Sequence, residues 1–244
     1  MKSILHRVKR KIREYLQGKK RVKEIKGMVN SIETKTEQFG NKYGGYKIAV
    51  DLLNHDRELT VLSFGIGEDL SFSEDVIHRL NAQVYAFDPT PRSSTYVANH
   101  ELANNERFHF FPYGISRETK TEKFYLPKVK EYVSCSTHHH DSVGEDYYEV
   151  EMHSFSQIID DLKISEIDIL KMDIEGSEFD VMDLILSSGI SIHQIGIELH
   201  DHLFSDGSGH NKFVWIIKLL RDHSYHLVSI SASGHEMTFV QATE

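Results

Sequence analysis

Two carboxylates stand where an apolar run ends in the sequence Lys-Met-Asp-Ile-Glu-Gly, residues 171–176. Asp173 and Glu175 are separated by one residue, and a glycine follows at once. A second apolar run, 194–200, contains Glu198 and ends in His200. Carboxylate and imidazole groups at the ends of neighbouring strands suit two kinds of chemistry. They can accept a proton from a hydroxyl group, or they can bind a divalent cation.

Strands and helices alternate along the chain from residue 60, which is typical of βαβ units with a mostly parallel sheet. Main strands are expected at 60–65, 83–88, 107–115, 167–173 and 194–200, further strands at 121–127 and 147–153, and a closing pair at 225–231 and 236–242. The closing pair has a connection too short for a parallel crossover, so it must be antiparallel. We therefore predict an α/β fold, a Rossmann-like doubly wound sheet of about seven strands with an antiparallel last strand.

Capping patterns predict where several helices begin. Thr90 followed by Pro91 is a favourable N-cap with proline at the first helical position, and predicts a helix to about residue 103. Ser71, Ser154 and Ser177 are each followed three residues later by an acidic or amide side chain. This spacing predicts that each of these serines caps a helix.

The end of the first strand has the features of a ligand-binding turn. Gly65 and Gly67 allow close approach of a ligand to the backbone, and Asp88, 21 residues after Gly67, can accept hydrogen bonds from ribose hydroxyls. Leu70 replaces the third glycine of the dinucleotide fingerprint, and two acidic residues in the turn would repel a pyrophosphate. A cationic or zwitterionic ligand fits better. The alternative is a tight turn with a solvated acid beside it.

Three stretches, VLSFGIGEDLSF, AFDPT and LKMDIEGSEFDV, resemble S-adenosylmethionine-dependent methyltransferases of the FkbM type across roughly residues 60–200. The resemblance implies S-adenosylmethionine (SAM) as cofactor and methyl transfer to oxygen, often on sugars or other small metabolites. Asp69 departs from the small residue that is common in the family's glycine turn. The resemblance implies cofactor contacts at the ends of the first three strands, at Ser63, Phe64, Gly65, Gly67, Asp88, Pro89, Tyr113, Gly114 and Ile115.

Methyl transfer to a hydroxyl requires a base or a metal ion, and the acidic strand ends allow two arrangements. In the first, His200 is the base and Asp173 or Glu175 orients it. In the second, Asp173, Glu198 and His200 bind a divalent metal such as magnesium. Glu175 has a third, purely structural interpretation, in which it binds turn amides and favours the start of the next helix.

Two other functions use similar sequence features. An NAD-type oxidoreductase also has a glycine turn and an acid after the second strand, although the missing third glycine counts against it. A non-catalytic Rossmann-like interaction module would keep the fold alone. The three histidines His138–His140 suggest a metal, but adjacent side chains on an extended chain alternate in direction, so a loop beside the acceptor cleft is the better interpretation.

Charge divides the chain into two parts. Residues 1–27 hold 11 Lys/Arg and 2 Asp/Glu, whereas the rest holds 17 Lys/Arg and 35 Asp/Glu. The acidic body argues against nucleic acid as the main partner. We predict a basic helical extension at 1–45 and a methyltransferase domain at 46–244. The single cysteine, Cys135, and the absence of a long apolar stretch lead us to expect a cytoplasmic protein.

The basic segment 2–28 has the pattern of an amphipathic helix, which we expect Gly18 to interrupt. Its apolar residues recur at three- and four-residue spacing: Ile4, Leu5, Val8, Ile12 and Leu16. Such a helix can lie on the inner, anionic face of a membrane, pack on a partner helix in an oligomer, or pack on its own acidic body. Charge alone does not choose between these three.

Overall fold

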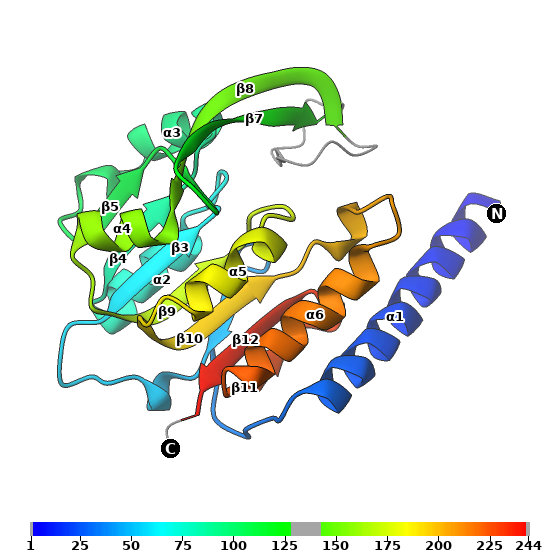
Figure 1. The fold of residues 1–244 in the computed structure, drawn as a ribbon. Coiled ribbons are helices and arrows are strands. Elements are labelled where there is room, and N and C mark those ends of the chain that lie inside the picture. The colour runs from blue at the N-terminus through cyan, green and yellow to red at the C-terminus, as the bar shows by residue number, and fades with distance from the viewer. Residues whose placement is uncertain (1, 128–142, 243–244) are drawn as a thin grey trace.

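The computed structural model describes residues 2–127 and 143–242, and its centre is a seven-stranded sheet (Figure 1). The strands of this sheet are β3 (Thr60–Phe64), β4 (Gln83–Phe87), β5 (Phe108–Phe111), β9 (Glu166–Met172), β10 (Ser191–Glu198), β11 (Tyr225–Ile230) and β12 (Glu236–Gln241). Their order is β11-β12-β10-β9-β3-β4-β5. Only β12 runs antiparallel to its neighbours, and the other pairs are parallel. The predicted fold class is confirmed.

Helices cover both faces of this sheet (Figure 1). They are α1 (Lys2–Met28), α2 (Ser71–Leu80), α3 (Pro91–Ala98), α4 (Phe155–Leu162), α5 (Glu178–Leu186) and α6 (Gly209–Asp222), with short 3-10 turns η1 (Val50–Leu52), η2 (Glu101–Asn104) and η3 (Asp201–Leu203). Side chains alternate between the two faces along each strand. Leu62 and Leu170 belong to the hydrophobic core that the sheet forms with α4, α5 and α6. Val61 and Ile169 belong to the core that it forms with α2 on the other face. The parallel strands are therefore apolar on both faces.

The capping predictions are half right. Thr90 and Ser154 accept hydrogen bonds from the amides of Ser93 and Gln157 and begin α3 and α4, as expected. Ser71 and Ser177 do not cap their helices. Ser177 precedes α5 with helical backbone angles (φ −73°, ψ −9°), whereas a capping side chain needs an extended backbone.

The start of α2 and the end of α3 also differ from the predictions. The N-cap of α2 is Leu70, and the amide of Ser71, its first residue, binds Asp69 Oδ1 at 2.8 Å. Helix α3 ends at Ala98 instead of continuing to residue 103, and η2 follows it.

The run 107–115 forms two strands instead of the single one expected. Strand β5 ends before Pro112, which has no amide hydrogen to continue a ladder, and β6 (Gly114–Ser116) joins a different sheet. That sheet also contains β7 (Lys120–Pro127) and β8 (Val143–Ser154), paired as an antiparallel hairpin. The hairpin arches over the carboxyl edge of the central sheet (Figure 1). The loop with His138–His140 lies outside the described residues.

The predicted helical extension, residues 1–45, also contains a strand. β1 (Glu37–Phe39) pairs with β2 (Tyr46–Ile48) across the predicted domain boundary at 45/46. Tyr46 packs against Gly196 of β10, where any side chain would collide with its ring. The buried amide of Gln194 makes two hydrogen bonds with the backbone of Ala49. This hairpin therefore covers part of a sheet face that no helix of the described chain covers.

Helix α1 is continuous through Gly18, so the predicted interruption is wrong. A side chain at Gly18 would lie 2.3 Å from the carbonyl oxygen of Ala232, so the glycine permits close packing on the body. No helix in the described part of the chain is long and apolar enough to cross a membrane.

A buried ion pair holds the edge of the sheet opposite the acidic strand ends. Asp168, fully buried in β9, binds both terminal nitrogens of Arg57 at 2.8 and 2.9 Å. The same carboxylate accepts the amide of Thr60 at 2.7 Å. The pair therefore connects the loop before β3 to the start of β9.

We expect Asp168→Ala to lower the free energy of unfolding by about 2 kcal/mol, since the Thr60 amide loses its acceptor and the part-buried Arg57 guanidinium keeps only Glu166 as a carboxylate partner. Urea unfolding followed by circular dichroism measures this loss. The exposed Asp56→Ala, in the same loop, is the control and should change stability by less than about 0.5 kcal/mol. Equal stability of the two variants would contradict the structural role of the pair.

Candidate functional site

The turn between β9 and α5 has an unusual backbone. Glu175 and Gly176 both have positive φ, +52° and +101°. A glycine adopts such a value easily, but a glutamate requires local compensation. Glu178, fully buried in the first turn of α5, provides it by accepting the amides of Ile174 and Gly176, each at 2.9 Å. The structural role considered for Glu175, binding turn amides, is thus performed by Glu178.

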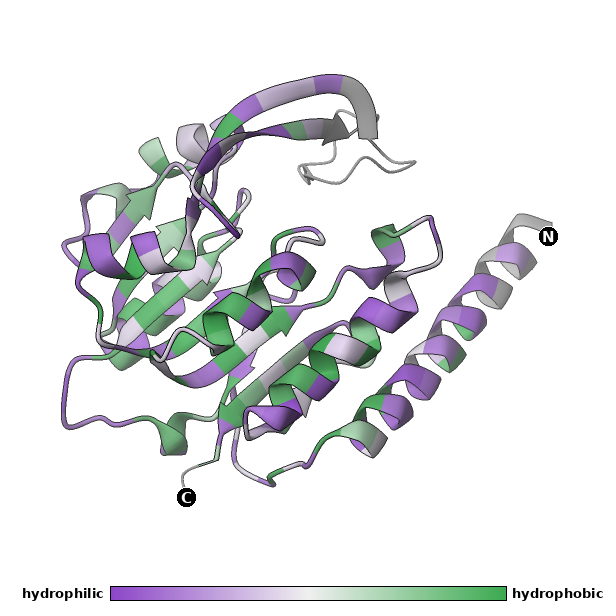
Figure 2. Ribbon diagram, viewed as in Figure 1, coloured by the Kyte–Doolittle hydropathy of each residue, from purple (hydrophilic) through white to green (hydrophobic). Residues whose placement is uncertain are grey.

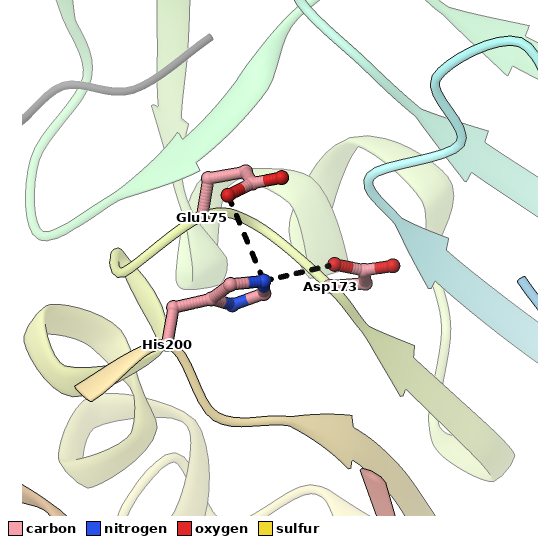
Figure 3. A group of neighbouring side chains, drawn as sticks. All are labelled: Asp173, Glu175 and His200. Carbon is pink, nitrogen blue, oxygen red and sulfur yellow. Dashed lines mark ion pairs between the residues drawn. The ribbon is translucent and has the colours of Figure 1, made fainter. Parts of the chain in front are cut away.

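The same buried carboxylate also holds His200. The Nδ1 atom of His200 lies 3.0 Å from Glu178 Oε1, so Glu178 joins the turn after β9 to the end of β10. The Nε2 atom faces two further carboxylates, Asp173 at 3.7 Å and Glu175 at 3.6 Å (Figure 3). A fourth, Glu198, lies 3.9 Å from Nε2. The structure therefore brings together the four residues predicted to cluster here: Asp173, Glu175, Glu198 and His200.

These carboxylates determine the charge on His200. Burial lowers the pKa of His200, but the hydrogen bond to Glu178 and the charges on Glu178, Glu175 and Asp173 outweigh burial and raise the pKa to about 10. Burial, followed by the charge on Asp173, raises the pKa of Glu198 to about 8. At neutral pH His200 is therefore an imidazolium that donates from Nδ1 to Glu178 and whose Nε2 lies 3.6–3.9 Å from three further carboxyl groups. Glu198 holds a proton.

These shifts predict how stability depends on pH. The pKa of folded His200, about 10, exceeds its ordinary value of 6.5, so its contribution is complete below pH 6.5 and is lost as the pH rises to 10. The raised pKa of Glu198 acts with the same sign, and its contribution is lost as the pH rises through 8. We expect the free energy of unfolding to fall between pH 6.5 and 10, as measured by urea denaturation.

The variant His200→Gln should flatten that pH dependence, because it removes the titration that spans the whole range from pH 6.5 to 10. His210→Gln, an exposed histidine on α6, is the matched control and should keep the wild-type slope. An NMR titration of the His200 ring measures its pKa independently. A ring that titrates near its ordinary pKa would contradict the assigned charge state.

The glycine turn after β3 packs directly on the acidic turn. Gly65 has a φ of +76°, and a side chain there would lie 1.7 Å from the carbonyl oxygen of Asp173. Lys171, buried in β9, donates from Nζ to the Gly65 carbonyl at 2.7 Å and lies 4.0 Å from Asp173, so it helps to hold the two turns together. Gly67, in contrast, has open space where a side chain would be. The two turns therefore form one unit with Gly67 at its open side.

Asp88 holds this glycine turn in place. Its Oδ2 accepts the amides of Ile66 and Gly67 at 3.1 and 2.9 Å, and its Oδ1 accepts the amide and hydroxyl of Thr90 at 2.9 and 2.6 Å. The residue is only 5% exposed. A carboxylate has about four acceptor positions, and these four bonds use them. A ribose hydroxyl would have to share an oxygen that already holds the turn.

A cleft lies between the two turns and under the β7–β8 hairpin. The predicted residues that line it are Phe64, Gly65, Gly67, Asp88, Pro89, Gly114, Ile115, Asp173 and Glu175. His200 and Glu198 stand beside its acidic end without lining it. Ser63 is buried inside β3, and Tyr113 stacks on the ring of His153 at 3.9 Å, so neither lines the cleft.

Four residues of this cleft come from segments that the sequence patterns did not connect with a ligand site. Tyr43 and Gly44 come from the turn between β1 and β2, and Phe124 and Met152 come from the hairpin β7–β8. Asn41, in the same turn as Tyr43, donates to Asp69 at 2.8 Å and fastens this turn beside the glycine turn. Nothing in the sequence Gly-Asn-Lys-Tyr-Gly-Gly-Tyr at 40–46 indicated a ligand.

The acidic end of the cleft has the dimensions of a cation site. One ligand atom from each of Asp173, Glu175 and His200 lies within 4.8 Å of the other two. The predicted set contained Glu198 in place of Glu175. Two carboxylates and one imidazole suit a hard divalent cation such as Mg²⁺ or Mn²⁺.

Comparison with known proteins decides the family. Residues 54–227 match the methyltransferase FkbM domain. The chain belongs to the FkbM methyltransferase family. Membership supports a SAM-dependent methyltransferase. In this FkbM protein the matched residues include both turns and the hairpin, whereas Tyr43 and Gly44 of the cleft precede them.

The solved structures with similar chains include the three that follow. The fibrillarin pre-rRNA processing protein of Methanococcus jannaschii is 12% identical, with a TM-score of 0.42 and 88% of each chain covered. TYW2 of M. jannaschii in complex with AdoMet is 11% identical, with a TM-score of 0.31, and the alignment covers 88% of this FkbM chain and 90% of that one. A putative transferase of Pyrococcus horikoshii is 11% identical, with a TM-score of 0.32 and coverage of 84% and 70%. None of the curated proteins matches the FkbM chain.

Proposed function

We propose that this protein transfers a methyl group from SAM to a hydroxyl oxygen of a sugar or another small acceptor. The observation that carries the proposal is a single cleft at the carboxyl edge of the sheet, with a glycine turn at one side and a carboxylate cluster at the other. Ligands of open α/β sheets bind at this edge. Membership of the FkbM family supports the methyl donor, and the carboxylates support an acceptor that loses a proton.

The residues of the cleft fit SAM. The apolar side chains of Phe87, Ile115, Phe124 and Met152 suit the adenine ring, and the open backbone at Gly67 allows close approach. At the other end the carboxylates suit the cationic amino group and the sulfonium, whose methyl group is the one transferred when SAM is bound. The acidic turn that counts against a dinucleotide therefore favours this cofactor.

His200 is poorly suited to be the base in this protein. Its raised pKa keeps hydrogen on both ring nitrogens at neutral pH, its Nδ1 is bonded to Glu178, and the ring stands beside the cleft without lining it. We propose that His200 positions Asp173 and Glu175, and that Asp173, which lines the cleft, accepts the hydroxyl proton as the methyl group is transferred. The second arrangement is a divalent cation on Asp173, Glu175 and His200, supported by the compactness of that cluster.

Calorimetry tests the cofactor. We expect the protein to bind S-adenosylhomocysteine and not NAD, and Asp88→Ala to weaken that binding by at least tenfold. The reason is that loss of Asp88 frees two turn amides and removes a charge-assisted acceptor, a change of about 1.5–3 kcal/mol. Asp56→Ala, remote from the cleft, is the control and should bind as the wild type does. Binding of NAD alone would refute the proposed cofactor.

Transfer of labelled methyl from SAM to a cell extract tests the catalytic assignment. We expect Asp173→Asn to lower turnover by about 10²-fold or more, while the affinity for S-adenosylhomocysteine changes less than threefold. Asp183→Asn, which alters a surface ion pair of α5, should retain full activity. Full activity of Asp173→Asn would remove Asp173 as the base.

The same assay separates the two arrangements. Activity that survives EDTA supports the carboxylate base. Activity that EDTA abolishes and Mg²⁺ or Mn²⁺ restores supports the cation arrangement instead. Absence of transfer to any acceptor, with S-adenosylhomocysteine still bound, would favour the non-catalytic module.

A further inference from the structure

The second half of helix α1 is locked to the body of the protein. Arg21 makes two hydrogen bonds with Asp201, at 2.6 and 2.9 Å, and its guanidinium stacks on the ring of Phe213 at 4.0 Å. Ile25 of the same helix is fully buried. Together with the close contact at Gly18, these interactions give α1 a fixed rotation relative to α6, beside which it lies (Figure 1).

Two apolar residues of the first half, Ile12 and Leu16, face the opposite way. Ile12 is nine residues before Arg21, and Leu16 is nine residues before Ile25. Nine residues are about two and a half turns of an α-helix, so Ile12 and Leu16 point away from the face that docks. They are 54% and 58% exposed, and Tyr15 between them is 56% exposed.

This outward face continues along the helix as lysines. Lys19 and Lys23 follow Ile12 at spacings of seven and eleven residues, which places them on the same side, and both are exposed. Lys19 Nζ lies 4.7 Å from the centre of the Tyr15 ring. We call Ile12, Tyr15, Leu16, Lys19 and Lys23 the outward face of α1. Figure 2 shows the predominantly hydrophilic colouring of the helix that surrounds its apolar residues.

Charge restricts what can cover the outward face. Residues 2–20 contain eight Lys/Arg and a single acidic residue, Glu14. Pairing with the same helix of a second copy would bring two strongly basic segments together, which is unfavourable. The acidic body of the chain already contacts the other side of the helix. The remaining complement is a surface that is anionic and also accepts apolar side chains.

We propose that the outward face of α1 lies on a membrane surface rich in anionic phospholipid. Ile12 and Leu16 would enter the boundary between headgroups and acyl chains, Tyr15 would lie at headgroup level, and the lysines would contact lipid phosphates. The N-terminal end of α1 points to the side of the molecule over which the β7–β8 hairpin arches (Figure 1). The proposal does not depend on the proposed methyl transfer.

Vesicle co-sedimentation with the full chain tests the proposal. We expect binding to vesicles of phosphatidylcholine with phosphatidylserine, little binding to phosphatidylcholine alone, and weaker binding at higher salt because ions screen the attraction. A full chain that stays in the supernatant with anionic vesicles at low salt would overturn the proposal. So would equal binding to both kinds of vesicle.

Variants separate the outward face from the general basic charge. The double variant Ile12→Ser and Leu16→Ser should lower the membrane partition coefficient at least tenfold at unchanged net charge. Its unfolding midpoint should match the wild type, because both side chains are exposed. Gln17→Ser, an exposed polar residue of the same helix, should partition as the wild type does.

Two further outcomes would overturn the proposal. The first is a double variant that partitions like the wild type. The second is a full chain that is dimeric by light scattering and becomes monomeric in the double variant, since the occupant of the face would then be a second copy.

Discussion

A single buried carboxylate, Glu178, holds together the parts from which the site is built. It accepts two amides of a turn with two consecutive positive φ values and binds the imidazole at the end of the neighbouring strand. A buried charge is stable only when it is fully hydrogen-bonded, and here the bonds come from two separate chain segments. The positions of Asp173, Glu175 and His200 all follow from this one anchor.

The fold was predictable because its signals are local or periodic. Short apolar runs separated by helix starts indicated the parallel sheet, and the brief final connection indicated its antiparallel strand. The failures came where backbone angles matter more than residue type. Ser177 has the spacing of a cap but a helical backbone, and Pro112 ends a ladder inside an apparently continuous strand. Neither fact is visible in a pattern of polar and apolar residues.

The site was predictable only in part. Asp173 and His200 stand out because they follow apolar strands, whose carboxyl ends meet at one edge of a sheet. Glu178 has no such signal, since a glutamate in the first turn of a helix is common and usually solvated. No pattern indicated that the oxygens of Asp88 hold the glycine turn, and its contact with a ribose stays a prediction. Tyr43 reaches the cleft from a distant segment that no local pattern connects with it.

The base of the β7–β8 hairpin supplies Phe124 and Met152 to the wall of the cleft. The hairpin and whatever fills the cleft therefore share contacts, and the free energy of one depends on the other. Coupling of this kind is reciprocal. If a molecule that binds the hairpin raises the affinity of the cleft for its ligand, that ligand raises the affinity of the hairpin for the molecule by the same factor. If one reactant binds in the cleft and the other contacts the hairpin, their binding is coupled through Phe124 and Met152 before the reaction begins.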